Sequence, residues 1–317
     1  MGTETAIELD GQYRLLREGA GLVDRSARGK LLVEGPDASE FLQGQITNDV
    51  QALSPGEGCY ATLLDRKGHL QADMRVLLLG PGRIWLDLEP GTSDAVMRHL
   101  SLYRVGSDVE ISDLDAERSI LSVIGSEAAA VTGTPDLAAE HAHRVLDVAA
   151  ARCRAVATDV GIDLISTTSD VDSVAASLCD AGAERVTEAA AEIVRVETGR
   201  PRFGCEMSTA TIPQEAGIEG RAVSFTKGCY IGQETVARLH YRGRPNRRLR
   251  GLRLTEPVAD GDPITRAGRE LGRIGTAVVS PALGPIALAI IRREAEPGSR
   301  VEVGSSGVGA EVVELPF

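Results

Sequence analysis

The sequence predicts an α+β protein whose chain ends in a small β-barrel. Over residues 1–243, strands and helices are interleaved without the even βαβ spacing of a doubly wound parallel sheet. Residues 244–317 show only short strand patterns, separated by Pro and Gly turns. The chain has 317 residues, of which 43% are hydrophobic and 25% charged, so it is long enough for two or three domains with cores of their own.

Apolar alternation and turn residues locate the elements of the first part of the chain. The strand 29–34 (GKLLVE) precedes a helix, 38–44, that Asp37 caps. A later helix is expected to have Ser93 as its N-cap. Between these helices lie three strands, separated by the turns RKG and GPG, at 58–65, 69–79 and 83–89.

The rest of the chain continues with short strands and two longer helices. These helices, 171–181 and 187–198, each end at a glycine. Further strands are expected at 108–111, 119–124, 143–149 and 161–166. The barrel strands are expected at 249–254, 272–280, 286–293, 300–303 and 310–317.

Composition excludes several classes of function. A net charge of −12 argues against a nucleic-acid binder that works through overall charge, and against a basic membrane-surface protein. We expect no signal peptide and no membrane span, because no apolar run is long enough. The five cysteines include no CxxC pair, so we expect free thiols in the reducing cytoplasm and no intrinsic metal site.

The segment 227–234 (KGCYIGQE) places a thiol, Cys229, just before a predicted helix that begins at GQET. The positive end of the helix dipole and the charge of Lys227 would both favour the thiolate, which is the reactive form of cysteine. Glycine near the thiol on both sides lets a substrate approach closely. The alternative is a buried, inert cysteine, which is the commoner fate of a free thiol.

An arginine-rich run, RLHYRGRPNRRLRGLR, covers residues 238–253. It would form an anion site for phosphates, a polyglutamate tail or RNA. Alternatively it is a solvated linker whose arginines pair with the carboxylates of this acidic protein.

Two carboxylates complete the set of candidates. Asp73 lies within a predicted strand, on one face with Gln71 and Arg75. Glu197 ends the apolar helix pattern IVRVE. Each carboxylate would bind a ligand or transfer a proton. The ordinary alternative for each is a salt bridge with a nearby arginine.

Taken together, KGCYIGQE, the preceding VRVETGRPRFG and IPQEAG, and the following RGRPNRRLRGL resemble the YgfZ-type branch of the glycine cleavage T-protein (GcvT) family. The segments GLVDRSARGKLLVEGPDASEFLQGQITNDV and GTAVVSPALGPIALAIIRR extend this resemblance almost from end to end. It implies three modules in a ring around a central cavity that binds tetrahydrofolate. Residues 1–50 and 113–243 would form the discontinuous first module, 51–112 the inserted second one, and 244–317 the barrel.

The resemblance also implies roles for individual residues. Glu197 matches a glutamate that binds the pterin ring in this family. Asp73 matches the second aspartate of an Asp-Asp pair implicated in folate-linked proton transfer. Ala72 replaces the first aspartate of that pair, so only half of the pattern is kept. Cys229 stands in a loop that carries no cysteine in T-proteins, and this difference favours the YgfZ-type branch. Further folate contacts would come from Lys227, Tyr230, Gln233, Arg221 and Arg242.

These implications favour a cytoplasmic, monomeric tetrahydrofolate-binding protein that supports the assembly or repair of iron–sulfur clusters in client proteins, with Cys229 as the working thiol. The first alternative is a folate-dependent aminomethyl- or methyltransferase in which Asp73 assists proton transfer. The second alternative is a tRNA- or RNA-binding module built on the arginines of residues 238–253.

Overall fold

The computed structural model describes residues 8–137 and 139–317, and the chain divides into two compact units. The first unit takes its described residues from Met1–Leu42, Val50–Tyr60 and Met74–Ala191. The second unit comprises Gln43–Asp49, Ala61–Asp73 and Glu192–Phe317. The chain therefore passes between the two units several times, and two strands, described below, contribute residues to both.

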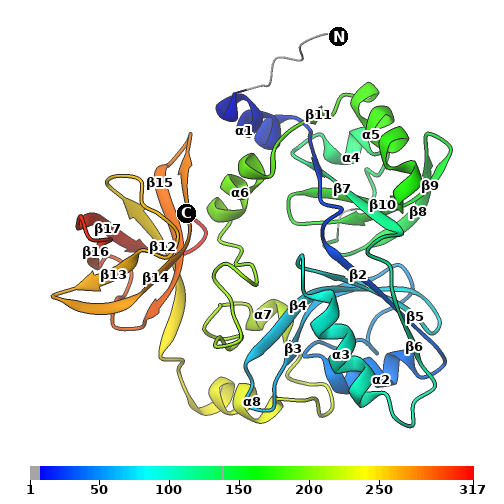
Figure 1. The fold of residues 1–317 in the computed structure, drawn as a ribbon, viewed down its shortest axis with the longest axis horizontal. Coiled ribbons are helices and arrows are strands. Elements are labelled where there is room, and N and C mark those ends of the chain that lie inside the picture. The colour runs from blue at the N-terminus through cyan, green and yellow to red at the C-terminus, as the bar shows by residue number, and fades with distance from the viewer. Residues whose placement is uncertain (1–7, 138) are drawn as a thin grey trace. The chain divides into compact units, whose positions relative to one another are not determined.

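One six-stranded sheet lies within the first unit and has the strand order β11-β1-β7-β10-β9-β8 (Figure 1). Helix α5 (Val171–Asp180) packs its buried side chains, among them Val174 and Leu178, against strand residues such as Val123 and Leu164. The apolar spacing of this helix predicts that face. The strands are β1 (Gly21–Asp24), β7 (Arg118–Ile124), β8 (His143–Val148), β9 (Ala151–Ala157), β10 (Gly161–Thr167) and β11 (Glu184–Arg185), and the other helices are α1 (Leu9–Glu18) and α4 (Ala128–Val131).

The second sheet has five strands in the order β3-β4-β5-β2-β6. Its strands are β2 (Gly29–Glu34), β3 (Gly58–Leu64), β4 (Leu70–Gly80), β5 (Arg83–Leu88) and β6 (Glu110–Asp113). Helices α2 (Ala38–Gln45) and α3 (Ser93–Tyr103) follow β2 and β5 in the chain. The expected N-cap was wrong by one residue, because Ser93 is the first helical residue and Thr92 stands at the cap position.

Buried charges join the two sheets inside the first unit. The side chain of Asp87 has no exposed surface and accepts from Arg28 at 2.7 Å and from Arg75 Nε at 2.5 Å. Arg75 also contacts Asp163 of β10 at 2.6 Å. Burial alone would raise the pKa of Asp87, but the two guanidinium charges lower it below its usual value.

The C-terminal strands form a closed barrel with the order β12-β15-β14-β13-β16-β17. Its interior is apolar, with Leu252, Ala289, Ile291 and Val303 fully buried. The strands are β12 (Arg247–Leu254), β13 (Pro263–Arg266), β14 (Arg269–Ser280), β15 (Gly284–Arg292), β16 (Arg300–Val303) and β17 (Val308–Val313). This barrel and the mixed α/β sheets confirm the predicted fold class.

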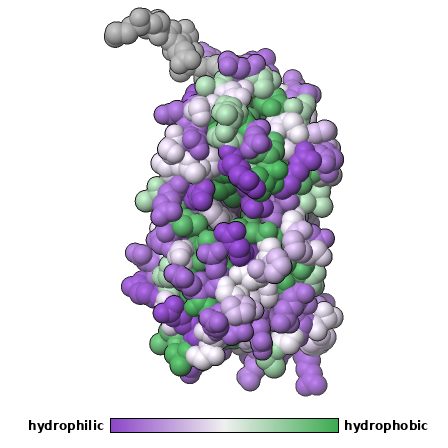
Figure 2. All heavy atoms as spheres, turned by 90° about the vertical axis from the view of Figure 1, so that its right-hand side faces the viewer, coloured by the Kyte–Doolittle hydropathy of each residue, from purple (hydrophilic) through white to green (hydrophobic). Residues whose placement is uncertain are grey.

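The surface shown in Figure 2 is mostly hydrophilic, with apolar residues in small separate areas. The large hydrophobic side chains that the described residues expose are scattered along the chain: Leu9, Leu102, Val105, Val145, Tyr241 and Val279. Their separation is ordinary for a protein surface. Apolar burial is therefore concentrated in the sheets and the barrel.

In the second unit, the end of helix α6 (Glu188–Glu197) is tied to the barrel by Arg195. Its guanidinium contacts Glu192 at 2.8 Å, Glu206 at 3.0 Å and Thr276 Oγ1 of β14 at 2.8 Å. The Glu206 side chain has no exposed surface. A buried carboxylate of this kind is tolerated only while its cationic partner is present.

We expect Arg195→Met to lower the free energy of unfolding by about 3–5 kcal/mol, because it leaves the Glu206 carboxylate buried without its cation. The matched control is Arg269→Met, which breaks an ion pair with Glu294 whose side chains are 62% and 46% exposed. That control should cost less than about 1 kcal/mol. Urea denaturation followed by circular dichroism measures both, and equal losses would contradict the assignment.

Candidate functional site

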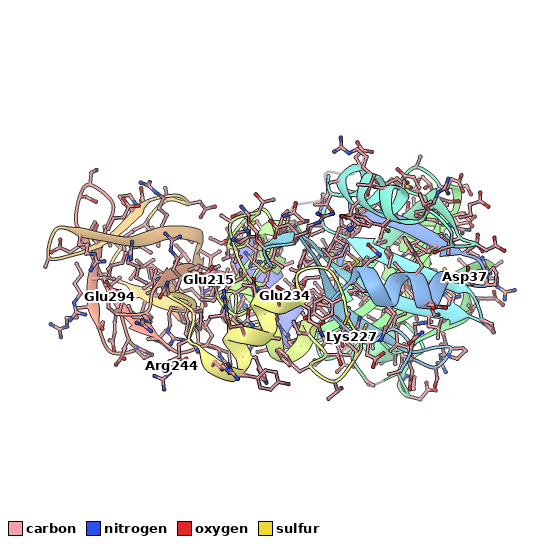
Figure 3. All side chains as sticks on the ribbon, turned by 90° about the horizontal axis from the view of Figure 1, so that it is seen from below. Asp37, Glu215, Lys227, Glu234, Arg244 and Glu294 are labelled. Carbon is pink, nitrogen blue, oxygen red and sulfur yellow. The ribbon has the colours of Figure 1, made fainter. Side chains whose placement is uncertain are left out.

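The candidate residues all belong to the second unit. The best-defined group among them is the segment 227–234, which we call the thiol loop. Within it, Cys229 is exposed, whereas Lys227 and Tyr230 on either side are buried. Lys227 and Glu234, labelled in Figure 3, are its first and last residues. Helix α8 (Gln233–Arg242) begins within the loop, as predicted, four positions after the thiol.

A buried ammonium group anchors the thiol loop. Lys227 Nζ donates to the backbone carbonyls of Gln43, Ile46 and Asn48 at 2.7, 2.8 and 2.8 Å. It also lies 5.2 Å from the centroid of the Tyr230 ring, within the range of a cation–π contact. The ammonium thus engages backbone oxygens in its own unit and holds the loop, while a thiolate at Cys229 stays a prediction.

A close backbone approach requires glycine at the far end of the thiol loop. Gly232 has φ +84°, and a Cβ placed there would lie 2.5 Å from the carbonyl oxygen of Asp65. Nε2 of Gln233 reaches back to the carbonyl of Gly228 at 3.4 Å. The loop is therefore held at both ends and presents its thiol between them.

Tyr230 faces inward and keeps its proton. Only 7% of the residue is exposed, and burial raises the pKa of its phenol to about 12. A phenol with this pKa is a hydrogen-bond donor at neutral pH, so any ligand contact through its oxygen would be made by a neutral group.

Asp73 lies on β4, where it is 7% exposed. Successive strand residues face opposite sides, so Ala72, which is fully buried, points away from the side of Asp73. An aspartate at position 72 would therefore not share the face of Asp73. The replacement of the first acid by alanine leaves the side of the sheet that carries Asp73 unchanged.

Glu197 is also buried, at the C-terminal end of α6, with 7% exposure. Its Oε1 accepts a hydrogen bond from Ser280 Oγ at 2.5 Å, and Ser280 Oγ in turn accepts from the backbone N–H of Leu283 at 3.0 Å. The backbone N–H of Phe317 donates to the Glu197 carbonyl at 3.1 Å. The carboxylate is thus oriented by the turn between β14 and β15.

The two candidate arginines lie in different surroundings. Arg221 belongs to helix α7 (Glu219–Ala222), and its carbonyl accepts from Asn48 Nδ2 at 2.9 Å, so it is tied to the same 43–49 segment as Lys227. Arg242 is exposed at the end of α8. The contacts described here bring Arg221 and Lys227 to one segment, but they do not include Asp73, Glu197 or Arg242.

The arginine run is largely solvent-exposed. Arg250 pairs with Glu314 at 3.0 Å, and within residues 8–137 and 139–317 the other arginines of positions 238–253 form no ion pair. Beside them, Phe225 stacks on His240 with the ring centroids 3.7 Å apart, and Tyr241 meets His240 edge-on at 4.8 Å.

Among the residues that the structure describes, no three His, Cys, Asp or Glu side chains are grouped so that they would hold a metal ion. None of the described helices is both long and apolar enough to cross a bilayer.

Sequence reasoning missed the partners that position these groups. Arg195 stands two residues before Glu197 in VRVE, yet its partners Glu206 and Thr276 lie 11 and 81 positions further along the chain. Ser280, which orients Glu197, is 83 positions away. A chain position carries no signal for such a partner, because only folding brings the two together.

We expect Lys227→Met to lower the free energy of unfolding by about 3 kcal/mol, since it leaves three carbonyls without their donor. Hydrogen exchange should also become faster in 43–48 and in the thiol loop. Lys67→Met, at an exposed lysine, is the control and should change stability by less than about 0.5 kcal/mol. If the two variants behave alike, Lys227 does not anchor the loop.

Thiol alkylation should separate the cysteines by burial. In the native protein, we expect Cys229 to be modified rapidly and Cys153 to remain protected, because Cys153 is 1% exposed and burial raises its pKa to about 11. Mass spectrometry after iodoacetamide treatment, with and without urea, measures both sites. Protection of Cys229 in the native state would show that the thiol loop is closed over it.

Two family profiles together match nearly the whole chain. The family profile described as "GCVT N-terminal domain" matches residues 7–227, and "Glycine cleavage T-protein C-terminal barrel domain" matches residues 247–317. An aminomethyltransferase of Rubrobacter xylanophilus is 28% identical over 100% of this chain and 88% of its own length. An aminomethyltransferase of Corynebacterium aurimucosum is 30% identical over 96% of this chain and 89% of its own length.

A solved structure shows the same fold. The glycine cleavage system aminomethyltransferase T from Bartonella henselae superposes with a TM-score of 0.87, covering 98% of this chain and 89% of its own, at 23% identity. The assignment to the YgfZ-type branch stays a prediction, because these matches identify the wider family and do not distinguish its branches. The two profile matches together show that this chain belongs to the glycine cleavage T-protein (GcvT) family.

Proposed function

We propose that the protein binds tetrahydrofolate and transfers a one-carbon unit to it from an aminomethyl donor. The single observation that carries this proposal is the full-length similarity to relatives named aminomethyltransferase. GcvT aminomethyltransferases use tetrahydrofolate. Two of its amines would bond to the aminomethyl carbon, while the bond from that carbon to its carrier and the bond to its nitrogen break, so that ammonia and the free carrier leave. This assignment favours the first alternative drawn from the sequence over the iron–sulfur interpretation.

The buried acids support the proposal chemically. Glu197 is a carboxylate held in one orientation by Ser280, and such a group would accept hydrogen bonds from the amino and N–H edge of a pterin ring. Asp73, shielded on β4, would hold or move the proton that carbon transfer displaces. Lys227, Tyr230, Gln233, Arg221 and Arg242 would serve as further folate contacts.

A second candidate function rests on the thiol loop. Cys229 is exposed on a loop that a buried lysine anchors, and an accessible thiol of this kind suits transient contact with a client iron–sulfur protein. A single thiolate does not hold a cluster alone, so the contact would be shared with the client. An RNA-binding role is less well supported, because the net charge of −12 opposes binding of a polyanion.

Titration and turnover separate these functions. We expect Glu197→Gln to weaken tetrahydrofolate binding about ten- to a hundredfold, because it removes a charged acceptor. Asp73→Asn should lower the rate of carbon transfer with little change in binding. Ser280→Ala is the matched control, since it removes one hydrogen-bond donor to Glu197 but keeps the carboxylate. An equal loss of binding in that variant would assign Glu197 a structural role only.

The thiol is tested in the same assays. Under the transferase proposal, Cys229→Ser should keep tetrahydrofolate binding and carbon transfer. The second candidate, the iron–sulfur role, would be favoured if cells that carry Cys229→Ser lose iron–sulfur enzyme activity while cells that carry Asp73→Asn keep it. Absence of both binding and transfer in the wild type would refute the transferase.

A further inference from the structure

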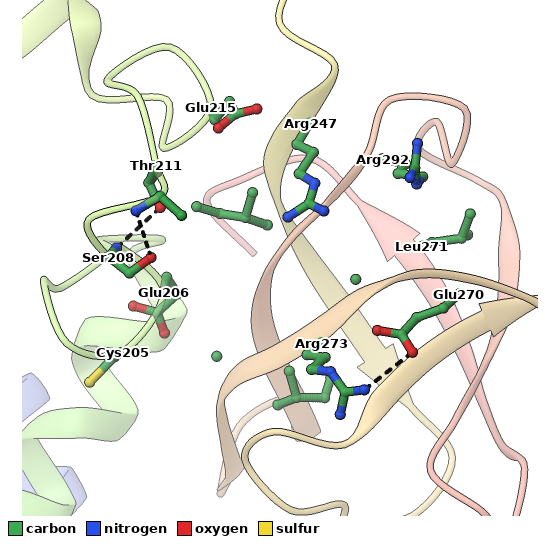
Figure 4. Close-up of a pocket in the computed structure, with 15 residues that line it drawn as sticks. Cys205, Glu206, Ser208, Thr211, Glu215, Arg247, Glu270, Leu271, Arg273 and Arg292 are labelled. Carbon is green, nitrogen blue, oxygen red and sulfur yellow. Dashed lines mark hydrogen bonds and ion pairs between the residues drawn. The ribbon is translucent and has the colours of Figure 1, made fainter. Parts of the chain in front are cut away.

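A pocket of about 480 Å³ lies within the second unit, between the 205–215 loop and one face of the barrel (Figure 4). Its size is that of a small-molecule site. None of the candidate folate residues lines it. The polar lining side chains include Ser208 and Thr211 on one side and Arg247, Glu270, Arg273 and Arg292 on the barrel.

Two arginines face each other across the barrel strands at this pocket. Arg247 of β12 is the direct register partner of Arg292 of β15. Directly opposed residues have their Cβ atoms about 5 Å apart, and like charges in this arrangement destabilise a sheet. Arg273 of β14 pairs with Ile290, two positions from Arg292, so the three arginines share one face of the barrel.

The positive charge of this face is only partly matched by the protein. Arg273 contacts Glu270 at 3.2 Å in an exposed pair. Neither Arg247 nor Arg292 forms an ion pair within residues 8–137 and 139–317, and Glu206 is already engaged by Arg195.

The remaining acid of the wall is Glu215, a half-buried carboxylate. Burial raises its pKa, against the opposing effects of Arg247 and His69. With Glu206 paired to Arg195, three guanidinium groups meet two carboxylates, Glu215 and Glu270, in the wall, so this part of the pocket has an excess of positive charge that suits an anion.

The opposite wall of the pocket is a hydrogen-bonded turn with two hydroxyl groups. The backbone N–H of Ser208 donates to Thr211 Oγ1 at 3.1 Å, and the N–H of Thr211 donates to the Ser208 carbonyl at 3.0 Å. The Thr211 carbonyl accepts from the N–H of Leu70 at 2.8 Å, which holds the turn in place. Both hydroxyl groups belong to an ordered wall and not to a loose loop.

We infer that this pocket binds a small organic oxyanion, through Arg247 and Arg292 with support from Arg273. Phosphates and carboxylates present the paired oxygens that a guanidinium fork binds bidentately. A concave site with Glu215 and Glu270 in its walls suits a compact anion better than an extended nucleic-acid backbone. The inference is independent of the proposed one-carbon transfer.

Isothermal titration of the full chain at low salt tests the site, with inorganic pyrophosphate and citrate as probes for the phosphate and carboxylate sources. We expect at least one probe to bind. Arg292→Gln should weaken it about ten- to a hundredfold, and Arg247→Gln/Arg292→Gln should weaken it further. Glu215→Gln should tighten binding, because it removes a negative charge from the wall.

The matched control is Arg266→Gln/Arg300→Gln, which removes the same charge from barrel strands outside the pocket. It should keep the wild-type affinity. The inference is overturned if neither probe binds, if both double variants lose affinity equally, or if Glu215→Gln weakens binding. It is also overturned if only an RNA oligonucleotide binds and the pocket double variant abolishes that binding.

Discussion

The guanidinium of Arg195 is the interaction on which the second unit most depends. It joins the last turn of α6 to Glu206 of the following loop and to Thr276 on the barrel. The carboxylates that it contacts, Glu192 and Glu206, are largely or fully buried, so the ion cluster is stable only when α6, the loop and β14 are all in place. Because Glu206 also lines the arginine-bordered pocket, the same cluster shapes one wall of that site.

The lysine of the thiol loop acts by a similar principle. Its ammonium replaces water at three backbone carbonyls, and the segment from residue 43 to residue 48 is thereby held against the loop that exposes Cys229. A reactive thiol and a folate contact would require different features of this loop. The first requires an open sulfur, and the second requires the inward-facing Tyr230 and a fixed backbone. In the structure Cys229 is exposed and Tyr230 is buried, so chemical assays are needed to separate the thiol hypothesis from the folate hypothesis.

Several sequence predictions agree with the structure because they rest on local rules. The strand GKLLVE is β2, and IVRVE ends α6 as expected. Strands β9 and β13 were not predicted: ARCRAVA mixes charged with apolar residues, and PITR is only four residues long. The N-cap at Ser93 was misplaced because Thr92 and Ser93 are both good capping residues, and local preference does not choose between neighbours.

The sequence by itself determined the fold class, the C-terminal barrel and the family resemblance, because period-two alternation, turn residues and contiguous motifs are all properties of short segments. It also marked Asp73, Glu197 and Cys229 as candidates. Only the tertiary structure decided that the Lys227 ammonium is buried against carbonyls and that Ser280 orients Glu197. Only the tertiary structure, likewise, places Arg247 and Arg292 next to each other on neighbouring strands at a pocket. These contacts join residues far apart in the chain, and their energies depend on burial, which no single segment specifies.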